Sequence, residues 1–345
     1  MFDKRLFRPG ERVSPEQQQW PSIRGAINEA MREEMRRDPT VFQMGQDIAK
    51  APPFGVTAGL LKEFGPQCVR DAPCSEVAML GAAVGAALGG MRPIVEFQFG
   101  DFISVAMDQL THQAAMLRSL TGGQVNVPIV VRLPCGGGQG AGAQHSQSLY
   151  SWFVHAPGIK VVLPSTAADA KGLMKAAIRD PNPVLFFEHK ALYRTRWPVP
   201  PDYSDPDFLV RFGQAVVRKA GTDVTVVATL AMVHHALAAA EELAAEDISM
   251  EVVDPRTLVP LDAETIVHSV LKTGRIVVVD EAYLSCSIQS EIIALVTERA
   301  FGALKAAPRR LGNPGVPVPF APPLEDAVLP NKQQIVRVVR EVVRG

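Results

Sequence analysis

The chain has 345 residues, of which 47% are hydrophobic and 21% charged, and its formal net charge is −1. This length predicts two domains, because single hydrophobic cores seldom grow beyond about 250–300 residues. Lys and Arg are scattered along the chain, which argues against a basic surface that neutralises nucleic-acid phosphates.

The thiols and the apolar stretches indicate the compartment. Residues 1–17 lack the apolar core of a secretory signal, and the uncharged, apolar stretch Val77–Met91 is too short and too rich in Ala and Gly for a membrane span. The cysteines form neither a CxxC pair nor a metal-finger spacing. They are Cys68, Cys74, Cys135 and Cys286. We expect free thiols in a soluble, cytoplasmic protein.

Apolar runs alternate with helix-patterned segments along most of the chain. A continuous apolar run is typical of a parallel strand covered by helices on both faces. The first series of predicted strands is Val41–Gly45, Ile94–Phe97, Pro128–Leu133, Lys160–Leu163 and Val184–Glu188. The second series is Val224–Thr229, Met250–Asp254 and Ile276–Asp280. This alternation predicts an α/β fold with two doubly wound, mostly parallel-sheet domains.

Two segments carry apolar residues at helical spacing, Ile103–Leu117 and Lys332–Val343. Between the two strand series, Trp197–Asp207 contains four prolines in eleven positions. Proline fixes φ and removes a donor, so this run suits an extended linker. We predict one domain over residues 1–196, a proline-rich linker over 197–209 and a second domain over 210–345.

Glu76 precedes a segment in which Gly81, Gly85 and Gly89 recur every four residues. That spacing leaves one helix face without side chains, so another helix can approach closely. Because the segment is apolar all round, we expect it in a core or a subunit interface, where desolvation would favour proton exchange by the Glu76 carboxyl. The alternative is that Glu76 only caps the first helical turn.

The segment Cys135–Gln147 places five glycines ahead of His145. It resembles a phosphate cradle but matches neither GxxxxGK[ST] nor GxGxxG, and a flexible surface loop is equally consistent with it. A histidine on such a loop lies where α/β proteins bind ligands and can act as acid, base or carboxylate binder.

Phe99 and Phe102 are candidates for a wall against a planar cofactor, although core packing is the commoner use of aromatic residues. His234 and His235 are expected to be solvated or packed.

In this order, these features resemble the β subunits of the decarboxylating first component of 2-oxo acid dehydrogenase complexes, in the transketolase-like thiamine superfamily. The resemblance runs from about Ser22 to Val342. It is carried by APCSE, ending at Glu76, and by RPIVEFQFGDF, AQHSQSLY, PGIKVVLPS, DPRTLVPLD and VPVPFAPPLEDAVLP. It implies a thiamine pyrimidine-binding domain followed by a transketolase C-terminal-like domain.

The resemblance also implies a cofactor, thiamine diphosphate, shared with an α subunit that holds the diphosphate through Mg²⁺. Glu76 matches the family glutamate that hydrogen-bonds the pyrimidine ring and promotes loss of the thiazolium C2 proton. Phe102 matches the aromatic residue beside that ring, with Phe99 as a weaker candidate. His145 matches the histidine near the substrate carboxylate and the incoming lipoyl group.

A structural potassium ion is implied as well, although ordinary turn chemistry would explain the same residues. Its ligands would map to the carbonyls of Ile129, Val130 and Ala177, with Asp180 and Asn182. The chain has no convincing GDG motif with a downstream Asn, which fits a β subunit that needs an α partner. Gln46 stands where the family usually has a glutamate that links the two cofactor sites.

The implied assembly is a heterotetramer of two α and two β subunits with a lipoyl acyltransferase core. The implied reaction is oxidative decarboxylation of pyruvate or a branched-chain 2-oxo acid, or acetoin cleavage, with acyl transfer to lipoyl groups. The alternatives are half of a split transketolase-like ketol transferase and a non-catalytic scaffold subunit. We expect the second domain to serve assembly by pairing subunits and docking the acyltransferase core. Glu281 and the acidic neighbourhood of Glu291 could contact basic residues of that core, but a solvated face is the preferred interpretation.

Overall fold

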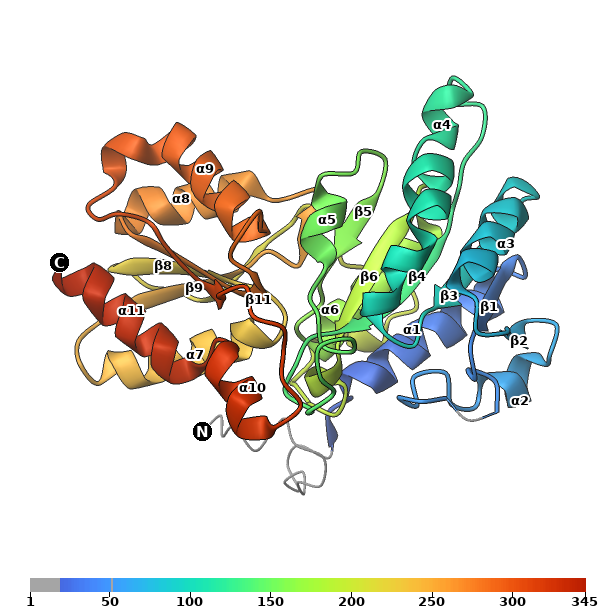
Figure 1. The fold of residues 1–345 in the computed structure, drawn as a ribbon, viewed down its shortest axis with the longest axis horizontal. Helices are drawn as coiled ribbons and strands as arrows, with labels where there is room; N and C mark the ends of the chain where they lie inside the picture. The colour runs from blue at the N-terminus through green and yellow to red at the C-terminus, as the bar shows by residue number, and fades with distance from the viewer. Residues whose placement is uncertain (1–18, 51) are drawn as a thin grey trace.

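A computed structural model describes residues 19–50 and 52–345, so the predicted absence of a secretory signal in residues 1–17 lies outside the described residues. The described strands form two sheets that lie side by side, each flanked by helices (Figure 1). The first sheet has seven strands in the order β10-β5-β6-β4-β3-β1-β2, and the second has five in the order β12-β11-β8-β9-β7. All neighbouring strands pair in parallel except β10 with β5 and β7 with β9. The predicted α/β fold with two mostly parallel sheets is confirmed.

The first half of the chain supplies most of the larger sheet. Its elements are α1 (Ile23–Arg37), β1 (Val41–Gly45), α2 (Leu60–Phe64), β2 (Val69–Asp71), α3 (Glu76–Leu88), β3 (Arg92–Glu96), α4 (Leu117–Leu120), β4 (Val130–Cys135), α5 (Tyr150–Val154), β5 (Lys160–Val162), α6 (Ala167–Arg179) and β6 (Val184–His189). The elements of the second half are β7 (Val216–Lys219), β8 (Val224–Ala228), α7 (Ala231–Ala244), β9 (Met250–Asp254), β10 (Thr257–Val259), α8 (Ala263–Thr273), β11 (Ile276–Tyr283), α9 (Ile288–Ala300), β12 (Arg309–Asn313), α10 (Pro322–Val328) and α11 (Lys332–Arg344). None of the helices in the described residues combines the length and hydropathy that a bilayer span requires.

Each predicted strand has an observed counterpart, and β1 and β9 have the predicted bounds. The sequence pattern misses β2, β7, β10 and β12, and each of these is an edge strand of its sheet. An edge strand has only one neighbour and is less completely covered, so it lacks the continuous apolar run that marks a central strand. Residues of β12, for example, are mostly exposed or half-buried.

The segment predicted as one helix over Ile103–Leu117 is helical but not a regular α-helix. A 3₁₀-helix over Gly100–Ala106 is followed by a π-helix over Asp108–Ala114 and then by α4. The apolar spacing coincides with the buried face, which includes Ile103, Leu110 and Ala114. It carries little information on which helical hydrogen-bond pattern the backbone adopts. Such π segments are often found at functional sites.

Helix α3 is buried on one face only. Met79, Leu80 and Ala83 lie in the core, where the helix packs against β3 and the two helices that follow β3. The opposite face is exposed and carries Val77 and Leu88. The sequence predicts this segment in a core or a subunit interface. The structure buries one face in the core and leaves the other apolar face exposed.

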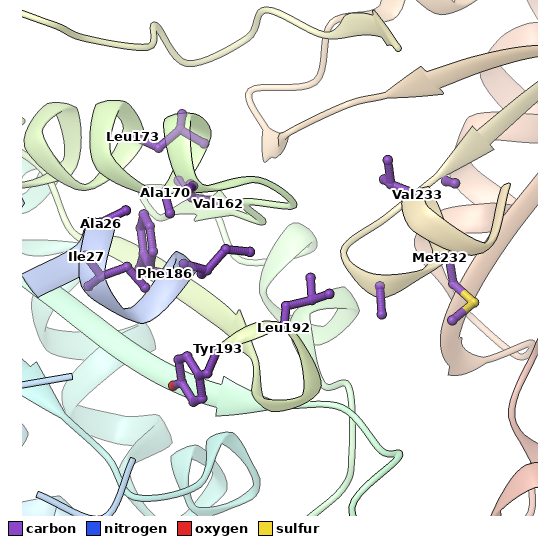
Figure 2. Packing of buried hydrophobic residues seen from close by; sticks show 14 of the residues in the cluster. Ala26, Ile27, Val162, Ala170, Leu173, Phe186, Leu192, Tyr193, Met232 and Val233 are labelled. Carbon is purple, nitrogen blue, oxygen red and sulfur yellow. The ribbon is translucent and has the colours of Figure 1, made fainter. Parts of the chain in front are cut away.

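The two halves of the chain share a strand and a core. Thr257 of β10 pairs with Val162 of β5, so the second half supplies an edge strand to the first sheet. One hydrophobic cluster contains Leu192 from the first half and Met232 from the second (Figure 2). In the proline-rich stretch between the halves, Tyr203 is buried, so this stretch is not a freely exposed linker.

Candidate active site

The candidate residues gather at the carboxyl ends of neighbouring parallel strands. Strands β3, β4 and β6 are adjacent, and the segments that follow them carry Phe99, His145 and Lys190. Parallel α/β sheets bind ligands at this edge, because the loops that leave adjacent strands meet there. The topology therefore brings together residues that are far apart in the sequence.

An aromatic cluster surrounds His145. The centre of its ring lies 4.4 Å from that of Phe99 and 5.5 Å from that of Phe102, in both cases edge to face. Phe54 extends the cluster, with its ring centre 5.7 Å from that of Phe99. The rings of Phe99, Phe102 and His145 are half-buried, so part of each remains accessible. The sequence analysis did not single out Phe54, which lies in an irregular segment without a regular pattern.

Two charged side chains hold the His145 segment against the first domain. The buried ammonium group of Lys190 donates a hydrogen bond to the main-chain carbonyl of His145. The Asp101 carboxylate accepts a hydrogen bond of 3.1 Å from the N–H of Gln147. Burial lowers the pKa of Lys190, although nearby acidic groups, including Asp101, oppose this effect. Sequence reasoning missed Lys190, because a lysine after a strand gives no sign that it is buried.

Glu76 is the first residue of α3 and is half-buried. Within the described residues its carboxylate has no hydrogen-bond, ion-pair or ring-contact partner, and neither Glu76 nor Ser75 makes a side-chain hydrogen bond that caps the helix. The capping interpretation therefore lacks a hydrogen bond. Helix α3 packs against the 3₁₀-helix that carries Phe102, so the unpartnered carboxylate and the aromatic cluster come from adjoining elements.

The glycine-rich loop is held by the second half of the chain. Three of its N–H groups bind carboxylates there: Gly138 donates to Glu325 at 2.8 Å, Gly140 donates to the other oxygen of Glu325 at 3.0 Å, and Gly137 donates to Glu281 at 3.1 Å. The interpretation as a free surface loop is therefore wrong, and these three N–H groups already have anionic acceptors.

Glu281, expected on a solvated face, instead has a side chain only 8% exposed. Its carboxylate lies 3.0 Å from Nε2 of His189. Burial acts to raise the pKa of Glu281, but the His189 imidazole and the Gly137 N–H outweigh burial and hold it at about 2. The sequence could not reveal this pair, because its members are 92 residues apart. Glu291 is exposed, as expected.

A buried ionic network lies in the first sheet. Arg132 on β4, fully buried, pairs with Glu96 on β3 and donates to both oxygens of Glu188 on β6 at 2.7 and 2.8 Å. Tyr193 donates a hydrogen bond of 2.8 Å to Glu188. Burial raises the pKa of Glu96, and Arg132 opposes that shift. The network fixes the relative positions of the three strands that present the candidate site.

The residues predicted to bind potassium make ordinary turn and strand contacts. Asp180 accepts hydrogen bonds from the N–H and side-chain amide of Asn182, at 2.9 and 3.1 Å, and its other oxygen pairs with Lys160. The Ile129 carbonyl accepts from a backbone N–H at 2.9 Å and the Ala177 carbonyl at 3.2 Å, while Val130 pairs within the sheet. Each carbonyl retains a second lone pair, whereas the Asp180 carboxylate is already neutralised by Lys160.

The departure at Gln46 has a local consequence. Gln46 is half-buried beside Asp47, which has a left-handed backbone with φ of 57°. The Asp47 carboxylate accepts a hydrogen bond of 3.3 Å from Gln98. Directly after β1 the chain thus has the uncharged Gln46, followed by Asp47, whose carboxylate accepts a hydrogen bond from the Gln98 amide.

The residues at this edge suit the pyrimidine end of thiamine diphosphate. An unpartnered carboxylate, Glu76, can bind a ring nitrogen, and the half-exposed rings of Phe99 and Phe102 can contact a flat heterocycle. Of the glycine-loop N–H groups, those of Gly137, Gly138 and Gly140 already bind Glu281 and Glu325. The described residues contain no group of three or more His, Cys, Asp or Glu that is placed to hold a metal.

Comparison with known proteins identifies two matching domains. Residues 19–196 match the family described as transketolase, pyrimidine binding domain, and residues 213–335 match transketolase, C-terminal domain. A solved structure described as a split gene transketolase, inactive beta4 tetramer, superposes with a TM-score of 0.75 at 23% identity, covering 94% of this chain and 99% of that one. At this identity the likeness shows the fold alone.

Several curated relatives are much closer in sequence. The chain is 47% identical to the β subunit of acetoin:2,6-dichlorophenolindophenol oxidoreductase of Cupriavidus necator, over 94% of this chain and 98% of the relative. It is 45% identical to the β subunit of 2-oxoisovalerate dehydrogenase of Bacillus subtilis, over 92% and 97%. It is 44% identical to the β subunit of the pyruvate dehydrogenase E1 component of Rhizobium meliloti, over 93% and 69%.

The fold and the two matched domains define a two-domain, transketolase-like protein, a class that uses thiamine diphosphate. The identities over more than nine-tenths of the chain are more specific. The chain belongs to the family of E1 β subunits of thiamine-dependent pyruvate, acetoin and branched-chain 2-oxo acid dehydrogenases, as the sequence resemblance predicts. Membership in this family implies an α subunit as partner.

Proposed function

We propose that this chain supplies the pyrimidine-binding half of an active site that decarboxylates a 2-oxo acid or cleaves acetoin and passes the acyl group to a lipoyl acceptor. The observation that carries the proposal is the unpartnered, half-buried Glu76 carboxylate on a helix that packs against the 3₁₀-helix containing Phe102. Because no side chain of the described residues binds it, this carboxylate is free to accept a hydrogen-bond donor from a ligand.

Each of the candidate residues has a task in this proposal. With the cofactor bound, Glu76 would hold the pyrimidine ring nitrogen and would promote removal of the proton at the thiazolium C2 position. Phe102, assisted by Phe99, orients the ring and excludes water from it. His145 binds the substrate carboxylate or the incoming lipoyl group. Bound thiamine diphosphate would supply the electron sink for the carbon–carbon bond cleavage.

The α subunit is proposed to hold the diphosphate through Mg²⁺. The occupied N–H groups of the glycine loop support this division, because they leave this chain without a free phosphate cradle. The exposed apolar face of α3, with Val77 and Leu88, supports a subunit contact close to Glu76. We further propose an assembly of two α and two β subunits, docking to a lipoyl acyltransferase core, and a cytoplasmic location.

The domain division and the potassium site stay proposals too. We propose a pyrimidine-binding domain over 1–196, a linker over 197–209 and an assembly domain over 210–345. For potassium, the carbonyls of Ile129, Val130 and Ala177 are the more suitable ligands, because Lys160 already neutralises Asp180. Asn182 would then act mainly by fixing Asp180.

The test of the reaction uses the chain co-purified with its α subunit. With thiamine diphosphate and Mg²⁺, we expect reduction of an artificial electron acceptor with one substrate among pyruvate, branched-chain 2-oxo acids, 2-oxoglutarate and acetoin. If a complex shown to hold cofactor reduces the acceptor with none of these substrates, ketol transfer or a scaffold role would be favoured instead.

A further inference from the structure

The glycine loop before His145 is held by the second half of the chain. Both oxygens of Glu325 on α10 accept loop hydrogen bonds, from Gly138 at 2.8 Å and Gly140 at 3.0 Å. Glu281, at the end of β11, accepts from Gly137 at 3.1 Å. Figure 1 shows the last part of the chain, with α10, reaching across to the loops of the first half. Two carboxylates from separate elements thus converge on one short loop.

The loop conformation is that of an anion-binding backbone. Gly136, Gly138, Gly140 and Gly142 all have left-handed φ, from 63° to 87°. Residues in alternating conformations turn successive N–H groups toward one side, which is how backbone concavities bind anions. Here the bound anion is the buried carboxylate of Glu325, and hydrogen bonds to an ionised acceptor are stronger than neutral ones.

Close packing reinforces these hydrogen bonds. A Cβ added at Gly137 would lie 2.4 Å from Leu329, and one at Gly142 would lie 2.4 Å from the Phe320 ring. Both contacts are made by side chains of the segment around α10, so a larger residue at either position would have to displace Leu329 or Phe320. The loop and this segment of the second half are thus packed directly against each other.

The held segment leads directly into His145. The N–H of His145 donates to the carbonyl of Gly142 at 3.2 Å, while Lys190 and Asp101 hold the other side of the histidine. The His145 ring is thus placed by groups from both halves of the chain. A shift of about 1 Å in a group of this kind can lower a rate by up to about 100-fold.

We propose that Glu325, assisted by Glu281, is a positioning residue: its carboxylate sets the path of the glycine loop and thereby places His145 for reaction with the substrate or the acyl acceptor. The second half of the chain then contributes to the chemistry as well as to assembly. This proposal rests on the proposed function, since it assigns the loop a task in that reaction.

The experiment compares Glu325→Gln and Glu325→Ala with Glu298→Gln, a control at an exposed glutamate of the same half, in the complete α–β complex. Hydrogen exchange of peptides covering residues 136–147 reports the loop directly. We expect the loop to exchange slowest in the wild type, faster in Glu325→Gln and fastest in Glu325→Ala, because Gln retains one acceptor oxygen. We expect kcat with a lipoyl acceptor to fall in the same order, by on the order of 10- to 100-fold for Ala, while the Kd of thiamine diphosphate stays unchanged.

Unchanged loop exchange in both Glu325 variants, or faster exchange with unchanged kcat, would overturn the proposal. Equal losses of kcat and of cofactor affinity would also overturn it, since they indicate general damage to the site. If Glu325→Ala fails to assemble, Glu325→Gln and Glu281→Gln carry the comparison. A wild-type complex without activity on any substrate would reject the proposed function instead, and the exchange measurement would still decide whether Glu325 sets the loop.

Discussion

The buried ammonium group of Lys190 donates a hydrogen bond to the main-chain carbonyl of His145. The same group lies 5.4 Å from the centre of the Phe99 ring, which itself contacts the His145 ring. A cation over an aromatic face is attracted by the ring, so one lysine ties the loop and the aromatic cluster together. This arrangement presents the His145 ring while its backbone is held fixed.

Replacement of His145 by Ala should impair the reaction more than cofactor binding. The ring contacts Phe99 and Phe102, but the backbone partners of residue 145 remain in the variant. We expect kcat to fall by about 100-fold or more, in the range typical of lost acid–base or electrostatic groups, with the Kd of thiamine diphosphate little changed. Steady-state kinetics and calorimetry of the α–β complex measure the two quantities. His112→Ala, at an exposed histidine, is the control, and an unchanged rate for His145→Ala would remove the histidine from the mechanism.

Glu76→Gln should abolish most turnover while the complex stays assembled. The side chain keeps its size, and no intrachain hydrogen bond is lost, because the carboxylate has none in the described residues. What disappears is the carboxyl group that would bind the pyrimidine nitrogen. Acceptor reduction and size-exclusion chromatography of the complex are the measurements. Near-normal turnover would show that Glu76 has no part in cofactor activation.

Much of the fold and part of this site could be predicted from the sequence. Central strands are recognisable because burial on both faces demands a continuous apolar run, and their order along the chain predicts a parallel sheet. Glu76, Phe102 and His145 could be selected because each lies in a short motif that resembles a family pattern. The structure then brings Phe102 and His145 into contact.

The remaining features depend on contacts between distant residues. Glu325 and Gly138 are 187 residues apart, and no local pattern marks either as the other's partner. Edge strands such as β12 lack an apolar run, and Lys190 carries no sign of burial in its sequence context. The sequence predicts a solvated Glu281, whereas its burial results from its contacts with His189 and Gly137 of the first half.

Arg132→Met should destabilise the chain strongly. The substitution leaves Glu96 and Glu188 buried in the sheet without their cation. Removing one partner of a buried ion pair typically costs about 3–5 kcal/mol, and urea denaturation measures the free energy of unfolding. Arg309→Met, which removes an exposed partner of Glu341, should cost no more than about 1 kcal/mol. Equal costs for the two variants would contradict the importance of the network.

The free energy of unfolding should depend on pH through His234. Burial lowers the pKa of His234 from its ordinary 6.5 to about 4, despite its hydrogen bond to the Ser165 carbonyl. The unfolded chain therefore takes up this proton first as the pH falls, so the contribution is fully present above about pH 6.5 and is lost as the pH falls toward 4. Between pH 7 and 5 the loss should be about 2 kcal/mol.

Denaturation of His234→Gln at the same two pH values tests this assignment, because Gln does not titrate. The variant should lack the loss, whereas His268→Gln, at an exposed histidine, should retain it. If the wild type and His234→Gln change equally with pH, another group carries the dependence.

Calorimetric titration with thiamine diphosphate and Mg²⁺ decides whether this chain holds only half of a thiamine site. Glu76 and the aromatic cluster suit the pyrimidine end, while the N–H groups of Gly137, Gly138 and Gly140 are already bound by Glu281 and Glu325. We predict no measurable binding to the purified chain alone and clear binding to its complex with the α subunit, reduced by Glu76→Gln. Tight binding to the chain alone would contradict the proposed division of the site between two subunits.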